Sequence, residues 1–153
     1  MRILLIVLIV IFVLIGGVSI MMIFKNQKTP ENLGVTSGKL APMPSSPNAV
    51  SSQTDIEEKR VDPLPFKSDL DSSKAAVLKA LGEYGDIEVM SDSANYIYAV
   101  HTTKTMRYRD DLEFYFDEGE QVVHFRSASR VGYSDRGLNR ERYNKLAEIY
   151  SQQ

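Results

Sequence analysis

The fold is predicted first from residues 111–126, DLEFYFDEGEQVVHFR. Leu112, Phe114 and Phe116 alternate with polar or amphipathic residues, which is the period-two pattern of a strand with one buried face. The residues DEGE then supply a turn, after which an apolar run resumes. The stretch therefore predicts an antiparallel hairpin made of strands over residues 111–117 and 121–131.

Two more strands are expected just before this hairpin. Residues 96–103, YIYAVHTT, are rich in the β-branched and aromatic residues that favour strands. A shorter strand is expected over residues 87–90, and the intervening SDSAN is a turn. Upstream, IEEKRVDPLPF is interrupted by Pro63 and Pro65, so it predicts a short edge strand or an extended arm.

Helices are predicted on both sides of these strands. DSSKAAVLKALGEYG, residues 71–85, has a capping Ser72 or Ser73 at its start and Gly85 at its end. The last helix is expected to begin at Asn139 as N-cap, and its apolar stripe is Tyr143, Leu146, Ala147 and Tyr150. The order helix, four strands, helix predicts an α+β fold, a four-stranded antiparallel sheet with the helices packed on one face.

An apolar segment without charge occupies residues 3–24. Its 22 residues would span about 33 Å as a helix, enough to cross the hydrocarbon core of a bilayer. A cleaved signal peptide is the alternative, but the run is long and ends in the bulky MMIF rather than in small residues. A buried helix of a soluble protein is disfavoured, because a small domain cannot cover it on all sides. We therefore expect an uncleaved, single-pass signal-anchor.

The rest of the chain divides into a linker and a domain. Residues 1–24 are the expected anchor, residues 25–31 a short flexible linker, and residues 32–153 one domain, in which 32–54 form an irregular belt and 55–153 the core. Basic residues flank the anchor on both sides, so charge alone does not set its orientation. When only a short segment precedes an anchor and a whole domain follows it, the domain is normally exported. We therefore expect the domain outside the cytoplasm, in a periplasm or equivalent space.

Composition excludes several functions. The chain has 18 basic and 20 acidic residues, a formal charge of −2, and no cysteine. A chain with this balance is not expected to bind nucleic acid. Without a thiol there is no disulfide, no cysteine nucleophile and no cysteine-ligated metal.

The segment from His124 to Leu146 holds five arginines and raises the question of an anion site. Free N–H groups at the start of the last helix attract anions, and arginines placed there are electrostatically disfavoured unless an acidic partner is present. The candidate binding residues for an acidic ligand or partner are Arg126, Ser127, Ser129, Arg130, Asp135, Asn139 and Arg140.

A structural ion-pair network is the competing interpretation, and it is favoured. Residues 54–120 hold twice as many acidic as basic residues, and residues 121–153 the reverse. Asp110, Asp111 or Asp135 can therefore pair with Arg126 or Arg130 inside the fold.

Catalytic and metal sites are not indicated. His124, Ser127 and Asp111 are the residue types of a hydrolase triad, but strand alternation places Ser127 and His124 on opposite faces. The chain has 2 histidines, with no ligand-like spacing around them. The adjacent Asp110 and Asp111 also alternate faces, so they do not form an acid–base pair. We assign no catalytic residue, metal or cofactor.

Three motifs resemble the domain-of-unknown-function family numbered 1499: LAPMPSSPNAVSSQ, YRDDLEFYFDE and RSASRVGYSDRGLNRERY. The resemblance covers residues 32–149. It implies a small envelope or organelle-lumen protein with an N-terminal signal or anchor, and an ordered belt over residues 32–53. Many relatives carry cysteines where this chain has Met43 and Ala49, so no thiol role transfers. The resemblance brings no catalytic residue, substrate or cofactor.

The expected function is a membrane-anchored binding or accessory module without catalytic activity. Its membrane contact is residues 3–24, and its Arg-rich turn would engage an acidic group of an envelope protein, a lipid headgroup or a small ligand. The alternative is an envelope enzyme that uses the Arg/Ser/Asp cluster.

Overall fold

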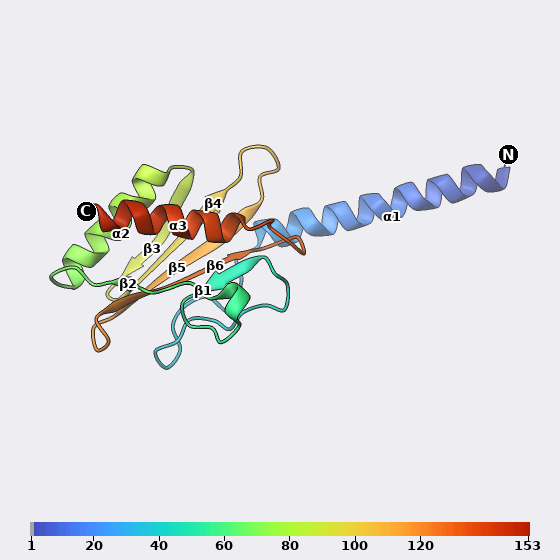
Figure 1. Ribbon diagram of the computed structural model, residues 1–153. Helices are drawn as coiled ribbons and strands as arrows, with labels where there is room; N and C mark the ends of the chain where they lie inside the picture. Colours follow the sequence, from blue (N-terminus) through green and yellow to red (C-terminus); the bar gives the residue numbers. More distant parts are fainter. Residues whose placement is uncertain (1) are drawn as a thin grey trace.

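A computed structural model describes residues 2–153 of the chain. One long helix, α1 (Arg2–Gln27), projects from a folded domain that holds all the strands and the other two α-helices of these residues (Figure 1). Most apolar side chains of α1 are exposed. Within residues 2–153, α1 is the one helix long and apolar enough to cross a membrane.

The domain is built on an antiparallel sheet with strand order β1-β6-β5-β4-β3, in which β2 also pairs with β6. Its four long strands confirm the four predicted ones: β3 (Ile87–Ser93), β4 (Tyr96–Thr102), β5 (Arg109–Asp117) and β6 (Val122–Ser129). The prediction of a four-stranded sheet is nevertheless wrong, because the sheet has six strands.

The two additional strands are β1 (Ala49–Ser51) and β2 (Leu64–Pro65), both paired with β6. Strands of two or three residues are too short to show alternation in the sequence, and both lie among prolines. Between them is a single turn of 3-10 helix, η1 (Glu57–Lys59). Pro65 is tolerated because it lies in a short strand outside the main ladder.

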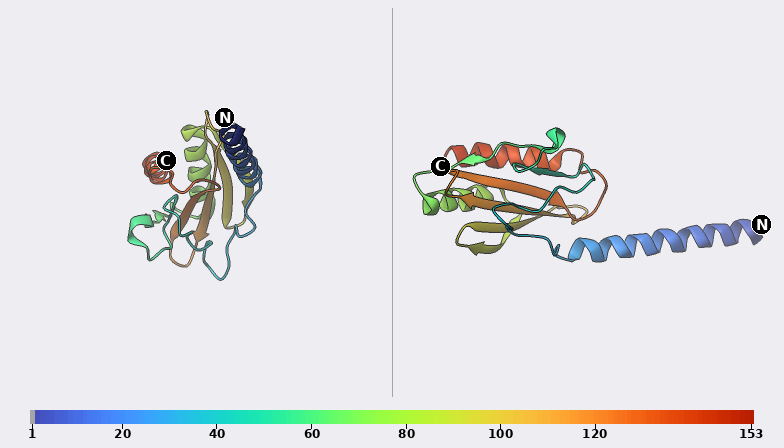
Figure 2. Two further views of the ribbon diagram at one scale, coloured as in Figure 1. Left: turned by 90° about the vertical axis from the view of Figure 1, so that its right-hand side faces the viewer. Right: turned by 90° about the horizontal axis from the view of Figure 1, so that it is seen from below.

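The helices α2 (Leu70–Tyr84) and α3 (Leu138–Ser151) cover one face of the sheet (Figures 1 and 2). This arrangement confirms the predicted α+β class. The core lies between the helices and the alternating apolar side chains of β4, β5 and β6. Cross-strand pairs set its register: Ile97 is opposite Phe114, and Phe114 is opposite Phe125. Their ring contacts continue to Tyr143 of α3.

Both helix starts differ from the predicted caps. The N-cap of α2 is Asp69, whose side chain accepts a hydrogen bond from the Ser72 N–H at 2.7 Å, so neither Ser72 nor Ser73 is the cap. Helix α3 begins at Leu138 after Gly137, which has a φ of 87°. Asn139 is inside the helix, and its own N–H donates to Asp135 at 2.8 Å. A carboxylate one turn ahead therefore replaces the side-chain cap expected from Asn139.

The end of α1 and the first belt residues lie on the sheet face opposite α2 and α3 (Figure 2). This face carries polar side chains that are nonetheless buried. Gly34 donates its N–H to the Glu113 carboxylate at 2.8 Å, and Leu40 is buried. The residues after α1 therefore pack against the domain.

Part of the linker expected over residues 25–31 lies in helix α1. Helix α1 continues through Gln27, and Asn26 is buried. The Asn26 side chain accepts a hydrogen bond from the Arg109 N–H at 2.9 Å and donates one to the Arg107 carbonyl at 2.8 Å. These contacts attach the last turn of α1 to the residues at the start of β5.

Truncation of the core tests this packing. Phe125 is fully buried between Phe114 and Tyr143, so Phe125→Ala should lower the free energy of unfolding by about 3–5 kcal/mol. Met90→Ala, on the exposed edge strand β3, should change it by less than about 0.5 kcal/mol. Urea unfolding of the full chain in detergent, followed by far-ultraviolet circular dichroism, measures both. Equal effects of the two substitutions would contradict the assigned core.

Candidate functional site

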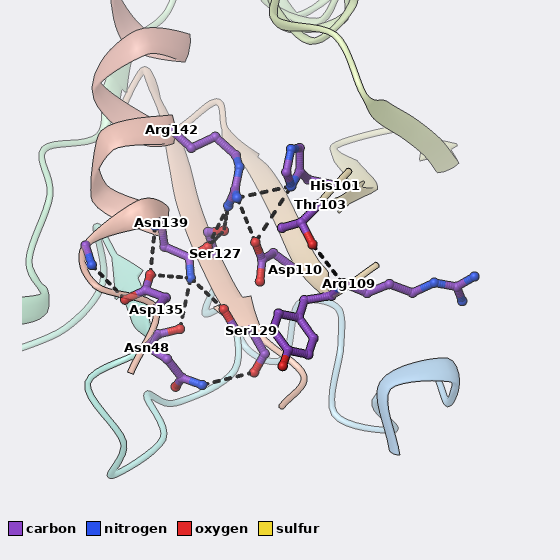
Figure 3. Close-up of polar contacts among 12 residues, drawn as sticks. Asn48, His101, Thr103, Arg109, Asp110, Ser127, Ser129, Asp135, Asn139 and Arg142 are labelled. Carbon is purple, nitrogen blue, oxygen red and sulfur yellow. Dashed lines mark hydrogen bonds and ion pairs between the residues drawn. The ribbon is translucent and has the colours of Figure 1, made fainter. Parts of the chain in front are cut away.

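The first polar cluster lies on the helix-covered face, where β4, β5 and β6 meet the start of α3 (Figure 3). His101, Asp110 and Ser129 are cross-strand neighbours in one row. Arg142 of α3 reaches down to this row, pairs with Asp110 at 2.6 Å and contacts the His101 Nδ1 at 3.1 Å. Because guanidinium is only a donor, the Nδ1 of His101 accepts.

The Asp110 carboxyl is held in its ionised form. Burial alone would raise its pKa, but the charge and hydrogen bond of Arg142, with the Ser129 hydroxyl, outweigh burial and hold the pKa below the ordinary value. Arg142 is itself 2% exposed. The pair is therefore enclosed within the fold and not presented to a ligand.

Asn139 is the second centre of this cluster. Its side-chain amide donates to the Asn48 carbonyl at 3.0 Å, the Ser129 hydroxyl at 3.0 Å and Asp135 at 2.8 Å. Its side-chain oxygen accepts from Ser127 at 2.5 Å and from Arg142 at 2.8 Å. One buried amide thus connects β6, the belt and the start of α3.

The opposite face holds a second set of buried charges. Arg126 pairs with Glu113 at 2.7 Å, and both side chains are almost fully buried. The same carboxylate accepts from the Tyr96 hydroxyl at 2.8 Å. Burial, followed by the charge of Glu113, raises the pKa of Tyr96, so its hydroxyl stays protonated and donates.

Arg130 and Asp111 form the third buried pair, at the end of the sheet next to α1. The single Nε–H group is shared between the two carboxylate oxygens, at 3.0 and 3.1 Å, and Nη2 donates to the carboxylate at 2.8 Å. Tyr98 donates to Asp111 at 2.6 Å and accepts from Arg130 at 3.0 Å. Burial and the contact with Asp111 raise the pKa of Tyr98 to about 12.

The remaining Arg130 nitrogen connects the sheet to α1. Its Nη1 donates to the carbonyls of Asn26 at 3.1 Å and Gln27 at 3.2 Å. These carbonyls belong to the last turn of the helix, where backbone acceptors lack intrahelical partners and the helix dipole is negative. Arg130 thus serves as a C-terminal cap supplied from a distant strand.

The predicted binding residues separate into distinct environments. Arg126 and Arg130 lie on one face, and Ser127 and Ser129 on the other, as strand alternation indicates. Asp110 and Asp111 likewise alternate faces. Asp135 binds the helix start rather than an arginine. Arg140 donates to the carbonyls of Glu58 and Arg60, both at 2.9 Å.

Sequence reasoning missed several partners. Glu113, Tyr98, Asn26, His101 and Arg142 complete the networks. The strand pattern already placed Glu113 on the outward face, but its complete burial depends on the belt, which has no periodicity. Only the three-dimensional pairing brings Asn26 to Arg130, because 104 positions separate them.

A hollow of about 590 Å³ lies at the other end of the sheet, beside the β5–β6 turn. Its walls include Asp117, Glu120 and His124, together with Ser52 and Arg60. The Ser52 hydroxyl is 3.2 Å from the His124 Nδ1. Burial lowers the pKa of His124, although Glu120 and Asp117 act in the opposite direction.

The family model described as "Protein of unknown function (DUF1499)" matches residues 39–149. The chain belongs to this family. A comparison with curated proteins found no match. The matched DUF1499 region contains all six strands of the sheet. It also contains the three buried Arg–carboxylate pairs, whereas α1 and Asn26 precede it.

Loss of one partner should expose the structural role of these pairs in the DUF1499 domain. Arg126→Ala leaves the Glu113 charge buried without a counter-ion, which should cost about 3–5 kcal/mol of stability. Lys145→Ala removes the exposed pair with Glu148 and should cost less than about 1 kcal/mol. Chemical unfolding of the full chain compares the two. An Arg126→Ala protein as stable as Lys145→Ala would show that the buried pair is not structural.

Acid should weaken the fold through Asp110. Its pKa in the folded chain is below the unfolded value of about 4. The stability that it contributes is therefore complete above about pH 4 and is lost as the pH falls through the folded pKa. Asp110→Asn removes this titration, so the stability of the variant, although lower at neutral pH, should fall less steeply below pH 4. Parallel slopes for both proteins would contradict the assignment.

Proposed function

We propose that this DUF1499 protein is a membrane-anchored module without catalytic activity, whose domain rests against the lipid surface outside the cytoplasm. Its anchor is α1, which exposes apolar side chains over a length sufficient for a bilayer. Such a surface is unfavourable in water and favourable in hydrocarbon.

The observation that carries this proposal is the junction between α1 and the sheet. Arg130 is bound at the same time by Asp111 and by the last carbonyls of α1. Asn26 adds hydrogen bonds to both flanks of the β5 start. A helix held in this way positions the domain at a fixed angle to the membrane, which a flexible tether would not do.

The acidic group that the module engages is then the phosphate of lipid headgroups. Lys25 and Lys28 line a pocket of about 380 Å³ at the end of α1, where Lys28 also pairs with the exposed Glu31 at 2.6 Å. Arg107 is exposed on the β4–β5 loop beside α1, and Arg136 is exposed in the predicted Arg-rich turn. Cationic groups close to an anionic membrane surface each contribute about 1 kcal/mol to binding.

Exposed apolar and aromatic side chains accompany these cations. Met106 and Tyr108 lie in the β4–β5 loop, and both line a second pocket with Met22 and Ile23 of α1. Tyr133, in the turn before α3, is 79% exposed. Tyrosine favours the membrane–water interface because its ring is apolar and its hydroxyl polar. The end of the domain next to α1 thus has the composition of an interfacial surface.

The alternative is an envelope enzyme that uses the Arg/Ser/Asp cluster. Such an enzyme needs a serine hydroxyl and an arginine head that can reach a substrate. Arg126, Arg130 and Arg142 are each occupied by a carboxylate of the same chain. The Ser127 hydroxyl donates to the buried Asn139. These contacts support the module over the enzyme.

Depth measurements on the full chain test the proposal, and the absence of cysteine permits single-site labels. Environment-sensitive dyes would be attached to Val13→Cys in α1, Met106→Cys in the β4–β5 loop and Glu118→Cys in the distant β5–β6 turn. In vesicles containing phosphatidylglycerol, spin-labelled lipids should quench the dyes at positions 13 and 106 but not at 118.

The outcomes separate the parts of the proposal. Quenching at position 13 alone would leave the anchor intact and reject contact between domain and lipid. Absence of quenching at position 13 would reject the anchor itself. Lys25→Gln with Lys28→Gln should reduce quenching at 106 and leave 13 unchanged. An impermeant maleimide should label Gln153→Cys in intact cells; labelling only after permeabilisation would reverse the proposed orientation.

A further inference from the structure

The β5–β6 turn brings three potential metal ligands together at the end of the sheet farthest from α1. Asp117 ends β5, Glu120 lies in the turn and His124 faces outward from β6. One ligand atom from each of the three residues lies within 4.8 Å of the others. The spacing in the sequence did not indicate this site, because it results from hairpin pairing.

His124 is placed as a ligand. Its side chain is 9% exposed, and its Nδ1 contacts the Ser52 hydroxyl at 3.2 Å. Ser52 is itself fixed, because its hydroxyl accepts the Phe125 N–H at 2.9 Å. The other ring nitrogen, Nε2, faces Glu120 at 3.6 Å, which is longer than a hydrogen bond. A metal-binding histidine usually donates its second ring N–H to an oxygen acceptor, and the Ser52 oxygen lies in that position at Nδ1.

The carboxylate of Asp117 is held in place by the turn. Its Oδ1 accepts N–H groups from Gly119 at 2.9 Å and from Glu120 at 3.0 Å. The second oxygen of this carboxylate remains available for a cation. The same two hydrogen bonds also fix the backbone that carries Glu120. Glu120 is exposed, so its side chain can rotate to complete a ligand set.

The donor set selects the class of ion. One imidazole and two carboxylates suit Zn²⁺ and the neighbouring divalent transition metals, which lie about 2.0–2.2 Å from such ligands. A calcium site would instead use six to eight oxygen ligands. The hollow of about 590 Å³ adjoins all three residues, so further coordination positions would face solvent.

We propose that Asp117, Glu120 and His124 bind one divalent transition-metal ion at the membrane-distal end of the domain. The ion keeps open coordination positions toward the hollow. Lys39 and Arg60 also line this hollow, and their positive charge favours an anionic group on those positions. This site is independent of the proposed membrane contact, because it involves neither α1 nor the β4–β5 loop.

Calorimetric titration with Zn²⁺ tests the site in the full chain, purified in detergent without a polyhistidine tag and freed of metal by a chelator. The wild type should bind one ion per chain, and its melting temperature should rise. Glu120→Gln removes an exposed ligand without disturbing the core and should weaken binding on the order of 10-fold or more. His124→Gln should weaken it further.

Glu118→Gln is the matched control, because Glu118 is an exposed carboxylate of the same turn outside the ligand set. It should bind Zn²⁺ as the wild type does. Equal weakening by Glu118→Gln and Glu120→Gln would indicate only diffuse attraction to an acidic turn and overturn the site. Absence of saturable binding, or binding unchanged by Glu120→Gln and His124→Gln, would also overturn it. Perturbation of the His124 imidazole nitrogen signals by the ion is the direct confirmation.

Discussion

The guanidinium group of Arg130 binds Asp111 of β5, Tyr98 of β4 and two carbonyls at the end of α1. These partners come from three separate parts of the chain and meet in one buried place. The charge of Arg130 is matched by Asp111 and by the negative end of the helix dipole. Without Arg130, the buried Asp111 carboxylate would lose its counter-ion, and the carbonyls of Asn26 and Gln27 would lose a donor. The relation between helix and domain therefore depends on Arg130, together with the hydrogen bonds of Asn26.

Asp110 and Asp111 each form a buried ion pair with an arginine, one on each face of the sheet. Because neighbouring strand residues point in opposite directions, Asp110 meets Arg142 of α3, and Asp111 meets Arg130 below α1. Buried ion pairs contribute little net stability, since desolvation offsets their attraction. Their effect here is geometric. A core of aliphatic side chains would tolerate small shifts of α3. The ion pair between Arg142 and Asp110 tolerates few such shifts, because the guanidinium must stay within reach of one carboxylate.

Much of the fold follows from local patterns in the sequence. Alternation over residues 111–117 predicted which side chains enter the core, and alternation in the next strand correctly separated Ser127 from His124. The short strand β2 lies within the edge strand or extended arm expected over residues 56–66, but β1 could not be found in this way, because pairing with β6 defines it and its own composition does not. The arginine partners were only partly predictable. Asp111 was among the candidates for Arg130, but Glu113 was not among those for Arg126, since its burial depends on Gly34 and the belt.

The contacts at the end of α1 would have a mechanical consequence in the bilayer that we propose α1 to span. The apolar run of about 33 Å slightly exceeds a hydrocarbon core of about 30 Å, so the helix would tilt to match the surrounding thickness. Because Asn26 and Arg130 bind the end of α1 to the sheet, the domain would tilt with the helix. The β5–β6 turn, which is farthest from α1, would then be displaced most. A change in local bilayer thickness would thereby change the height of that turn above the lipid.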